Sequence, residues 1–172
     1  MTAAAAQRED PRRVWCLWVL VSADMTGAAD ATNALHTFER AFVAPPIPPS
    51  ASEATPYFRV ERLEDYLPNP DAWAELRPRV AETIAAYGRN RDAIDAAIAK
   101  ASPRWRIERM PPIDRNLLRL GVTELVWLGP PQARATINGL IELAKRLGSE
   151  TTAAFVNGIL DQIRRDLEIP FE

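Results

Sequence analysis

Basic and aromatic side chains near the two ends of the chain are the residues best suited to chemistry, because such groups can bind the phosphates and stack on the bases of single-stranded nucleic acid. Arginine and lysine bind phosphate, and an aromatic ring stacks on an unpaired base, which contributes about 1–3 kcal/mol per base. The candidates are Arg8, Arg12, Arg13, Lys145, Arg146 and Phe155. The spacing around Phe155 also fits a core residue, and two cations before a helix end also fit favourable interaction with the helix dipole.

Residues for catalysis or metal binding are scarce. Cys16 is the lone cysteine and His36 the lone histidine. These two residues make no disulfide, zinc-finger pattern or catalytic triad. We therefore expect no cofactor, no metal and no enzymatic activity, and we expect His36 on a helix surface.

Composition indicates one domain without a global attraction to nucleic acid. The chain has 172 residues, with 21 basic and 23 acidic side chains, so any RNA affinity must come from a local patch. The apolar run at 14–21 is too short to cross a bilayer, which requires about 20 residues. It is interpreted as part of a buried first helix in a cytoplasmic protein.

Three patterned helices are predicted in the C-terminal third, at about 112–128, 133–147 and 149–167. Pro112 suits a first helical turn, Gly148 a left-handed C-terminal cap, and Ser149 an N-cap with Thr152 three residues later. Asn138 and Asn157 lie among the apolar stripes, which predicts buried amides that join helices.

The N-terminal part is predicted to be helical with one interruption. We expect an arm at 1–10, helices at 11–25 and 28–43, and a proline-rich insertion at about 44–69. A third helix at 70–87 should be kinked or divided at Pro78, and a pause at Gly88 and Asn90 should precede a further helix at 92–101.

The C-terminal segment closely resembles the NusB family of bacterial transcription antitermination factors. The matching residues are the Pro-Ile-Asp-Arg run at 112–115, Leu118-Arg119, Glu124-Leu125, Ile137-Asn138, the run 141–145, Gly148, the Phe-Val-Asn-Gly run at 155–158 and Leu160-Asp161. The resemblance implies an all-α bundle of about seven helices in two antiparallel helical halves, here forming a single domain at 11–172.

The resemblance also implies an RNA site at the N-terminus. In the family, an arginine-rich arm and the first helix contact a single-stranded element called boxA, and Arg13 matches the motif arginine. Val14, Trp18 and Val21 depart from that motif, and Glu9-Asp10-Pro11 replaces consecutive arginines. If the first and last helices lie side by side, as the resemblance implies, the basic and aromatic candidates can form one site.

Asp114 matches a family position that faces the ribosomal protein NusE, so it is the predicted partner surface. Its alternative interpretation is an acidic residue favoured in a first helical turn. A second basic cluster is interpreted as a solvated face with salt bridges to Glu108 and Asp114. It consists of Arg104, Arg106, Arg109, Arg115 and Arg119.

Two functions follow from these patterns. The first is a non-enzymatic adaptor that binds boxA-like RNA together with NusE, within an RNA polymerase antitermination complex that supports ribosomal RNA transcription. The second is a divergent protein-interaction module that has lost RNA binding. A methyltransferase of the kind that carries a similar domain is disfavoured, because the sequence has no glycine-rich phosphate loop. The sequence leaves open a homodimer, which exposed Trp15 or Trp18 would favour.

Overall fold

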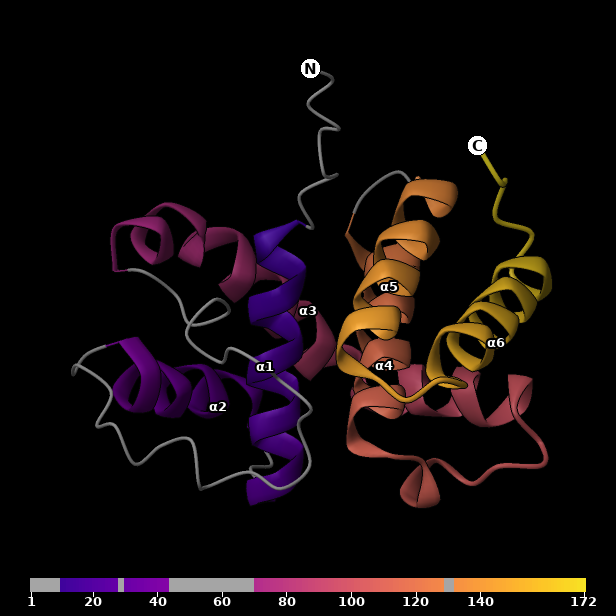
Figure 1. The fold of residues 1–172 in the computed structure, drawn as a ribbon, viewed down its shortest axis with the longest axis horizontal. Helices are drawn as coiled ribbons and strands as arrows, with labels where there is room; N and C mark the ends of the chain where they lie inside the picture. The colour runs from indigo at the N-terminus through magenta and orange to yellow at the C-terminus, as the bar shows by residue number, and fades with distance from the viewer. Residues whose placement is uncertain (1–9, 28–29, 44–69, 129–131) are drawn as a thin grey trace.

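The helices of this computed structural model form two groups on either side of α1. The structure describes residues 10–27, 30–43, 70–128 and 132–172, and these contain no β-strand. The α-helices are α1 (Pro11–Thr26), α2 (Ala31–Phe38), α3 (Pro70–Ala101), α4 (Pro112–Trp127), α5 (Ala133–Leu147) and α6 (Thr152–Asp166). Helices α2 and the start of α3 lie on one side of α1, and α4, α5 and α6 lie on the other (Figure 1). The predicted all-α class is confirmed.

Helix α1 begins and ends where its sequence predicts. Asp10 is the N-cap, and its carboxylate accepts a hydrogen bond from the Arg12 amide at 3.0 Å. Pro11 occupies the first turn, where no amide donor is needed. Gly27 ends the helix with φ of 69°, a left-handed conformation that glycine adopts without a Cβ penalty. These caps fix the position of the arginines in the first turn.

Helix α3 is one continuous element of 32 residues, so the predicted division is wrong. The helix passes through Pro78 and through Gly88, and the Asn90 side-chain amide donates to the Ala86 carbonyl at 2.8 Å. Val80 and Ile84 are buried on the same helix, and this tertiary packing outweighs the local helix-breaking preferences. The helices expected at 70–87 and 92–101 are one helix, α3. The described ranges therefore contain six α-helices, where about seven were predicted.

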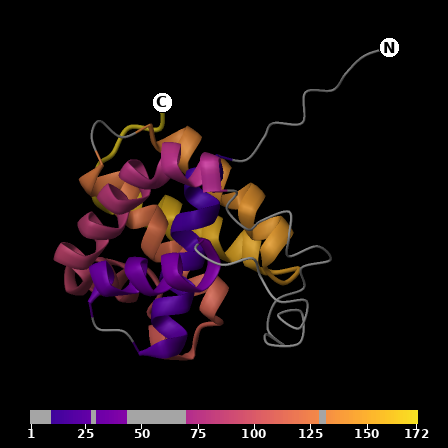
Figure 2. The same cartoon turned by 90° about the vertical axis from the view of Figure 1, so that its left-hand side faces the viewer.

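Helices α1, α2 and α3 pack against one another (Figure 2), and aromatic rings fill the core between them. The Trp15 and Trp73 rings lie 5.1 Å apart between centroids, and Phe38 lies 5.7 Å from Trp73. Trp15 is 5% exposed and Trp18 is half-buried. Trp15 is therefore not available to a partner, whereas Trp18 is accessible in part; the homodimer itself stays a prediction.

Helix α4 is the centre of the C-terminal group. Its residues from Ile113 to Leu125 are buried, except the half-buried Arg115. A Cβ built at Gly121 would lie 2.7 Å from the Leu160 methyl groups, so a glycine there allows α6 to pack closely on α4. Charged groups on so enclosed a helix must find partners inside the protein.

Both asparagines expected in the core are exposed, so that prediction is wrong. Their neighbours Ile137 and Val156 take the buried positions. One residue is about 100° of helical rotation, which turns Asn138 and Asn157 outward. The two amides therefore do not join helices.

The turn between α5 and α6 is built around Thr152. The Ser149 amide donates to Thr152 Oγ1 at 2.9 Å. Helix α6 begins at Thr152 with Thr151 as its N-cap, so the predicted N-cap at Ser149 is wrong. Gly148 is extended, with φ of −97° and ψ of −173°, so the predicted left-handed cap is wrong. A Cβ at Gly148 would lie 2.5 Å from the Thr152 Cβ, and glycine is needed for this close approach.

Two predicted segments lie outside the described residues: most of the arm at 1–10 and the proline-rich insertion at about 44–69. The second helix extends to Val43 through a π-helical turn at Glu39–Val43.

No helix within the described ranges has both the length and the apolar character that a bilayer span requires.

Candidate nucleic-acid interface

Two arginines in the first turn of α1 converge on one buried carboxylate in α4. Arg12 Nη2 donates to Glu124 Oε1 at 2.9 Å, and Arg13 Nη2 donates to Glu124 Oε2 at 2.8 Å. Arg12 Nη1 also donates to Thr83 Oγ1 at 3.2 Å, and the Glu124 side chain is 4% exposed. We call Arg12, Arg13 and Glu124 the arginine latch. It joins α1 to α4 at the end of the molecule where α1 begins.

The two arginines of the latch differ in what they offer to a ligand. Arg12 is 8% exposed, so the expectation of a surface guanidinium there is not met. Burial alone would lower the pKa of Arg12, but the attraction of Glu124 and Asp10 more than offsets this and raises it. Arg13 is half-buried, and its guanidinium reaches the surface of α5. The Arg12 and Arg13 side chains are 10% and 14% exposed, so Arg13 is the more accessible of the two by a small margin.

Gly139 makes room for Arg13 on α5. A Cβ built there would collide with Arg13 Nη1. The arginine side chain thus lies directly over the α5 backbone, which places the first turn of α1 beside α5. The expectation that the first and last helices lie side by side is wrong, because α4 and α5 lie between α1 and α6 (Figure 1). The first turn of α1 instead meets α5 at Gly139.

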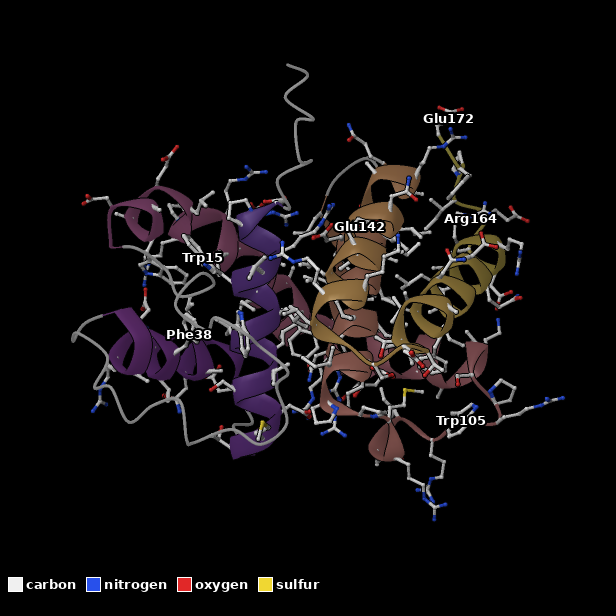
Figure 3. All side chains as sticks on the ribbon, in the orientation of Figure 1. Trp15, Phe38, Trp105, Glu142, Arg164 and Glu172 are labelled. Atoms are coloured by element: carbon white, nitrogen blue, oxygen red, sulfur yellow. The ribbon has the colours of Figure 1, made fainter. Side chains whose placement is uncertain are left out.

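The exposed face of α5 carries the remaining predicted cations. Arg146 follows Gly139 by seven residues, which is two turns and about 10 Å along the same helix face. Lys145 is exposed, and its Nζ pairs with Glu142 Oε1 at 2.6 Å. Glu142 is exposed on α5 (Figure 3). The exposed face of α5 therefore carries the cations Lys145 and Arg146 together with the carboxylate of Glu142.

Phe155 lies in the first turn of α6, across the short turn from Lys145 and Arg146. Its ring is half-buried and packs against the core, so the residue is both a core neighbour and partly accessible. A partly exposed ring next to cations can stack on a base. Arg8 lies outside the described residues.

Asp114 is buried, with 7% exposure, and therefore does not present an open surface to a partner. Thr152 Oγ1 donates to its Oδ1 at 2.8 Å, which ties the start of α4 to the start of α6. Burial raises the pKa of the Asp114 carboxyl, and the hydrogen bond from Thr152 offsets part of the rise. The carboxylate thus has a structural partner inside the chain.

We expect Asp114→Asn to raise the free energy of unfolding at about pH 7. A carboxyl with a raised folded-state pKa destabilises the fold when ionised, and asparagine still accepts the Thr152 bond without the charge. Near pH 3, below the unfolded-state pKa of about 3.9, the two proteins should be equally stable. Urea unfolding at both pH values measures this, with exposed Asp92→Asn as the control. Lower stability of Asp114→Asn at neutral pH would show that the helix dipole outweighs burial.

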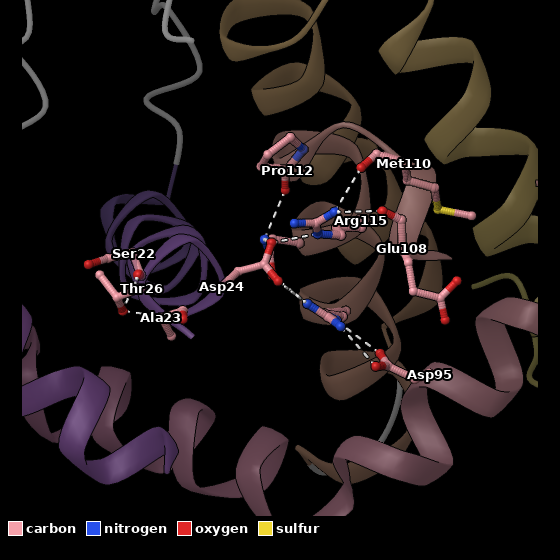
Figure 4. Close-up of polar contacts among 11 residues, drawn as sticks. Ser22, Ala23, Asp24, Thr26, Asp95, Glu108, Met110, Pro112 and Arg115 are labelled. Atoms are coloured by element: carbon pink, nitrogen blue, oxygen red, sulfur yellow. Dashed lines mark hydrogen bonds and ion pairs between the residues drawn. The ribbon is translucent and has the colours of Figure 1, made fainter. Parts of the chain in front are cut away.

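A second ion-pair network joins the C-terminal end of α1 to α3 and α4 (Figure 4). Asp24 Oδ2 accepts from Arg115 Nε at 2.5 Å, and Asp24 Oδ1 accepts from Arg119 Nη1 at 3.1 Å. Arg119 Nη2 also donates to Asp95 Oδ2 at 2.8 Å. We call these four residues the Asp24 network.

The Asp24 network corrects the expected solvated face. The Arg115 and Arg119 side chains are 17% and 7% exposed, so they are structural. Arg104, Arg106 and Arg109 are exposed as expected, with Arg106 3.4 Å from Glu108. Asp114 pairs with none of these arginines among the described contacts. The cluster divides because α4 turns its arginines inward, whereas the linker before it remains in solvent.

Sequence reasoning missed the roles of Glu124, Gly139 and Asp24. A signal existed for Glu124, because a charge in a helix that is apolar around it requires a cationic partner. The partner could not be identified, since Arg12 lies more than a hundred positions away in the sequence.

The described residues carry no sign of a catalytic centre. Burial raises the pKa of the Cys16 thiol to about 12, which leaves it protonated and unreactive at neutral pH. His36 is exposed beside Glu39, as predicted. In the described ranges, no three His, Cys, Asp or Glu residues gather where they could hold a metal ion. Fold and site thus define a helical module whose exposed basic and aromatic groups suit binding.

The comparisons identify the family. The profile of the NusB family matches residues 52–165. The transcription antitermination protein NusB of Myxococcus xanthus is 35% identical over 150 residues, which cover 87% of this chain and 100% of that protein. The same protein of Sorangium cellulosum is 48% identical over 93 residues, or 54% of this chain and 66% of that protein. The chain belongs to the NusB family of transcription antitermination proteins, which are not enzymes.

Solved structures agree with this assignment. T. maritima NusB superposes with a TM-score of 0.66 at 24% identity, covering 90% of this chain and 89% of that chain. A structure of the antitermination factors NusB and NusE in complex with dsRNA gives a TM-score of 0.62 at 24% identity, covering 91% and 95%. At this level of identity the likeness establishes the fold.

Proposed function

We propose that this protein is an RNA-binding adaptor of transcription antitermination. It binds boxA-like single-stranded RNA together with the ribosomal protein NusE, in the cytoplasm, and links nascent ribosomal RNA transcripts to an RNA polymerase antitermination complex. The observation that carries the proposal is the position of Arg13 over Gly139, on the same face of α5 as Arg146.

The arginine latch allows Arg13 to exchange its partner. When Arg13 turns toward a phosphate, Glu124 keeps the 2.9 Å bond from Arg12 and the bond from Thr136 Oγ1 at 3.4 Å. The buried carboxylate therefore remains neutralised, and the protein avoids the large cost of an unpaired buried charge. Arg12 supports the site by holding Glu124, and Arg13 makes the contact.

The RNA path that we propose runs from Arg13 along α5 to Lys145, Arg146 and Phe155. Phosphates would be bound by the cations and one base would stack on the accessible part of the Phe155 ring. Arg8 precedes the latch and would extend this path at its N-terminal end. The near-neutral net charge of −2 means that this local face, and not a general field, must supply the affinity.

The NusE part of the proposal is supported by a relative whose structure contains NusE and RNA. Asp114 remains our proposed position for the partner surface, but it would act by fixing the corner between α4 and α6. Its carboxylate is already bonded to Thr152 there.

A second candidate function is a protein-interaction module without RNA affinity. One observation favours it: Glu124 occupies the guanidinium groups of both Arg12 and Arg13. In this case the latch would be a purely structural ion pair.

We expect Arg13→Ala to weaken boxA RNA binding by about tenfold and to reduce the salt slope by about one. The reason is the loss of one phosphate contact, while Arg12 still neutralises Glu124. Binding of a boxA oligonucleotide is measured by fluorescence anisotropy at several salt concentrations, with and without NusE. Exposed Arg40→Ala, on the far side of α1, is the matched control.

Single replacement of Arg13 is the informative variant, because Arg12→Ala would remove a buried ion-pair partner and disturb folding. RNA binding with unchanged affinity and slope in Arg13→Ala would exclude the proposed path. NusE binding without any detectable RNA binding in the unmodified protein would establish the second candidate.

A further inference from the structure

The linker between α3 and α4 exposes a tryptophan among arginines. Trp105 is 62% exposed, whereas Trp15 and Trp73 are 5% and 4% exposed. We call Arg104, Trp105, Arg106 and Arg109 the linker patch, and all four are exposed. Trp105 lies at the edge of the molecule (Figure 3). Folding therefore leaves the largest apolar side chain type in water at this position.

The backbone of the linker is held in place on both sides of Trp105. The Trp105 amide donates to the Ser102 carbonyl at 3.1 Å, and Ser102 Oγ donates to the Trp105 carbonyl at 3.4 Å. Ile107 and Met110 are buried, and Arg115 Nη1 donates to the Met110 carbonyl at 3.0 Å. The exposed indole thus projects from an anchored turn, so that binding a ligand costs little ordering of the backbone.

The charge of the linker patch is positive and largely available. Arg106 is 3.4 Å from Glu108, but both side chains are well exposed, at 75% and 66%, so the pair is weak. Arg104 and Arg109 form no ion pair with any residue that the structure describes. Arg115 and Arg119 pair with carboxylates in the Asp24 network. The guanidinium groups of Arg104, Arg106 and Arg109 lie outside this network and face solvent.

We infer that the linker patch is a second contact for single-stranded RNA. A base would stack on the Trp105 indole, and the neighbouring phosphates would bind Arg104, Arg106 and Arg109. A protein partner is the less favoured occupant, because three arginines within six residues suit a repeating phosphate backbone and would require a matching run of carboxylates on a protein.

The position of the linker patch fits this role, which rests on the proposed RNA-binding function. The Asp114 to Thr152 bond joins the start of α4, just after the linker, to the start of α6. Phe155 follows Thr152 by one turn. The patch and the Phe155 end of the proposed path therefore belong to the same end of the C-terminal helix group, and RNA that continues past Phe155 approaches the linker.

Three oligonucleotides test the inference: a boxA-like RNA, the same RNA extended by about eight uridines at its 5′ end, and the same RNA extended by about eight uridines at its 3′ end. We expect Trp105→Ala to weaken binding of one extended RNA by about tenfold at low salt, and to leave binding of the short RNA unchanged. The double variant Arg104→Ala with Arg106→Ala should also reduce the salt slope for the extended RNA. Met25→Ala, which removes another exposed apolar side chain, and Arg40→Ala are the controls.

Tryptophan fluorescence supplies a readout that does not depend on the boxA site. Oligouridine should quench the emission of the unmodified protein, and Trp105→Phe should lose that quenching while retaining affinity for the extended RNA. If the α5 path fails because Arg13→Ala has no effect, quenching through Trp105 would still be observed. The inference would be overturned if Trp105→Ala binds both extended RNAs with unchanged affinity. It would also be overturned if Trp105→Ala loses NusE binding and keeps its RNA affinity.

Discussion

Glu124→Ala will lower the free energy of unfolding by about 3–5 kcal/mol. The Glu124 side chain is 4% exposed and accepts from Arg12 and Arg13, so its removal leaves the buried Arg12 guanidinium with only Asp10 and Thr83 as partners. A buried charge that loses its main partner costs more than the lost attraction alone, because the desolvation of the charge is no longer offset. Urea or guanidinium unfolding, followed by circular dichroism, measures the change.

Two further variants define the origin of the effect. Glu142→Ala removes an exposed carboxylate that also pairs with a cation, and should change stability by less than about 0.5 kcal/mol. Glu124→Gln preserves the side-chain volume and one acceptor oxygen. Its loss of stability should lie between the losses of Glu124→Ala and Glu142→Ala. A loss in Glu124→Ala as small as that in Glu142→Ala would show that water solvates the arginine latch.

Arg119→Ala will destabilise the protein by about 3 kcal/mol, through the Asp24 network. Arg119 is 7% exposed and bridges Asp24 of α1 to Asp95 of α3, so one side chain on α4 connects three helices. Its loss leaves Asp95 without that partner and removes the packing of the arginine stem. The same unfolding experiment measures this change.

Matched variants separate charge from packing at Arg119. Arg119→Met keeps an apolar stem, so a loss that persists in Arg119→Met belongs to the ion pairs. Arg165→Ala, an exposed arginine paired with Asp161, should alter stability by less than about 0.5 kcal/mol. If Arg119→Ala is no more destabilising than this control, then the network does not hold the three helices together.

The sequence predicts the C-terminal helices well because strong local signals coincide there. Pro112 starts α4, and the apolar stripe continues through Leu125. The last helix begins at Thr152, three residues after the predicted start. Caps, prolines and periodicity act within a few residues, so they can be read without a structure. The NusB-like pattern over the same segment led to the correct family and fold class.

Local signals fail where tertiary packing overrides them. Pro78 and Gly88 suggest a break, yet α3 continues because its buried face packs against both helix groups. Asn138 and Asn157 each lie next to a core position in the sequence. One residue corresponds to about 100° of helical rotation, which is enough to turn a side chain from the core to the solvent. Periodicity alone does not resolve this difference in a stripe with so many small and apolar residues.

The chemistry of the candidate site was predictable in kind but not in arrangement. The NusB resemblance, together with the chemistry of arginine, lysine and an aromatic ring, led to the RNA-binding hypothesis. The structure places Arg13 beside α5, whereas the first and last helices, which the hypothesis placed side by side, are separated by α4 and α5. It also buries Arg12 and Asp114, which the sequence placed at surfaces. The partners that bury them, Glu124 and Thr152, are distant in sequence, and no local pattern connects them.

By itself the sequence determined an all-α NusB-family chain, the bounds of its capped helices, and a supply of arginines suited to RNA. The tertiary structure decided which arginines are available. Arg12, Arg13, Arg115 and Arg119 pair with carboxylates inside the protein, whereas Arg146 and the three arginines of the linker patch are exposed. The physical reason is that a buried charge must be neutralised by a partner, and only the packing of distant helices selects which charges are buried.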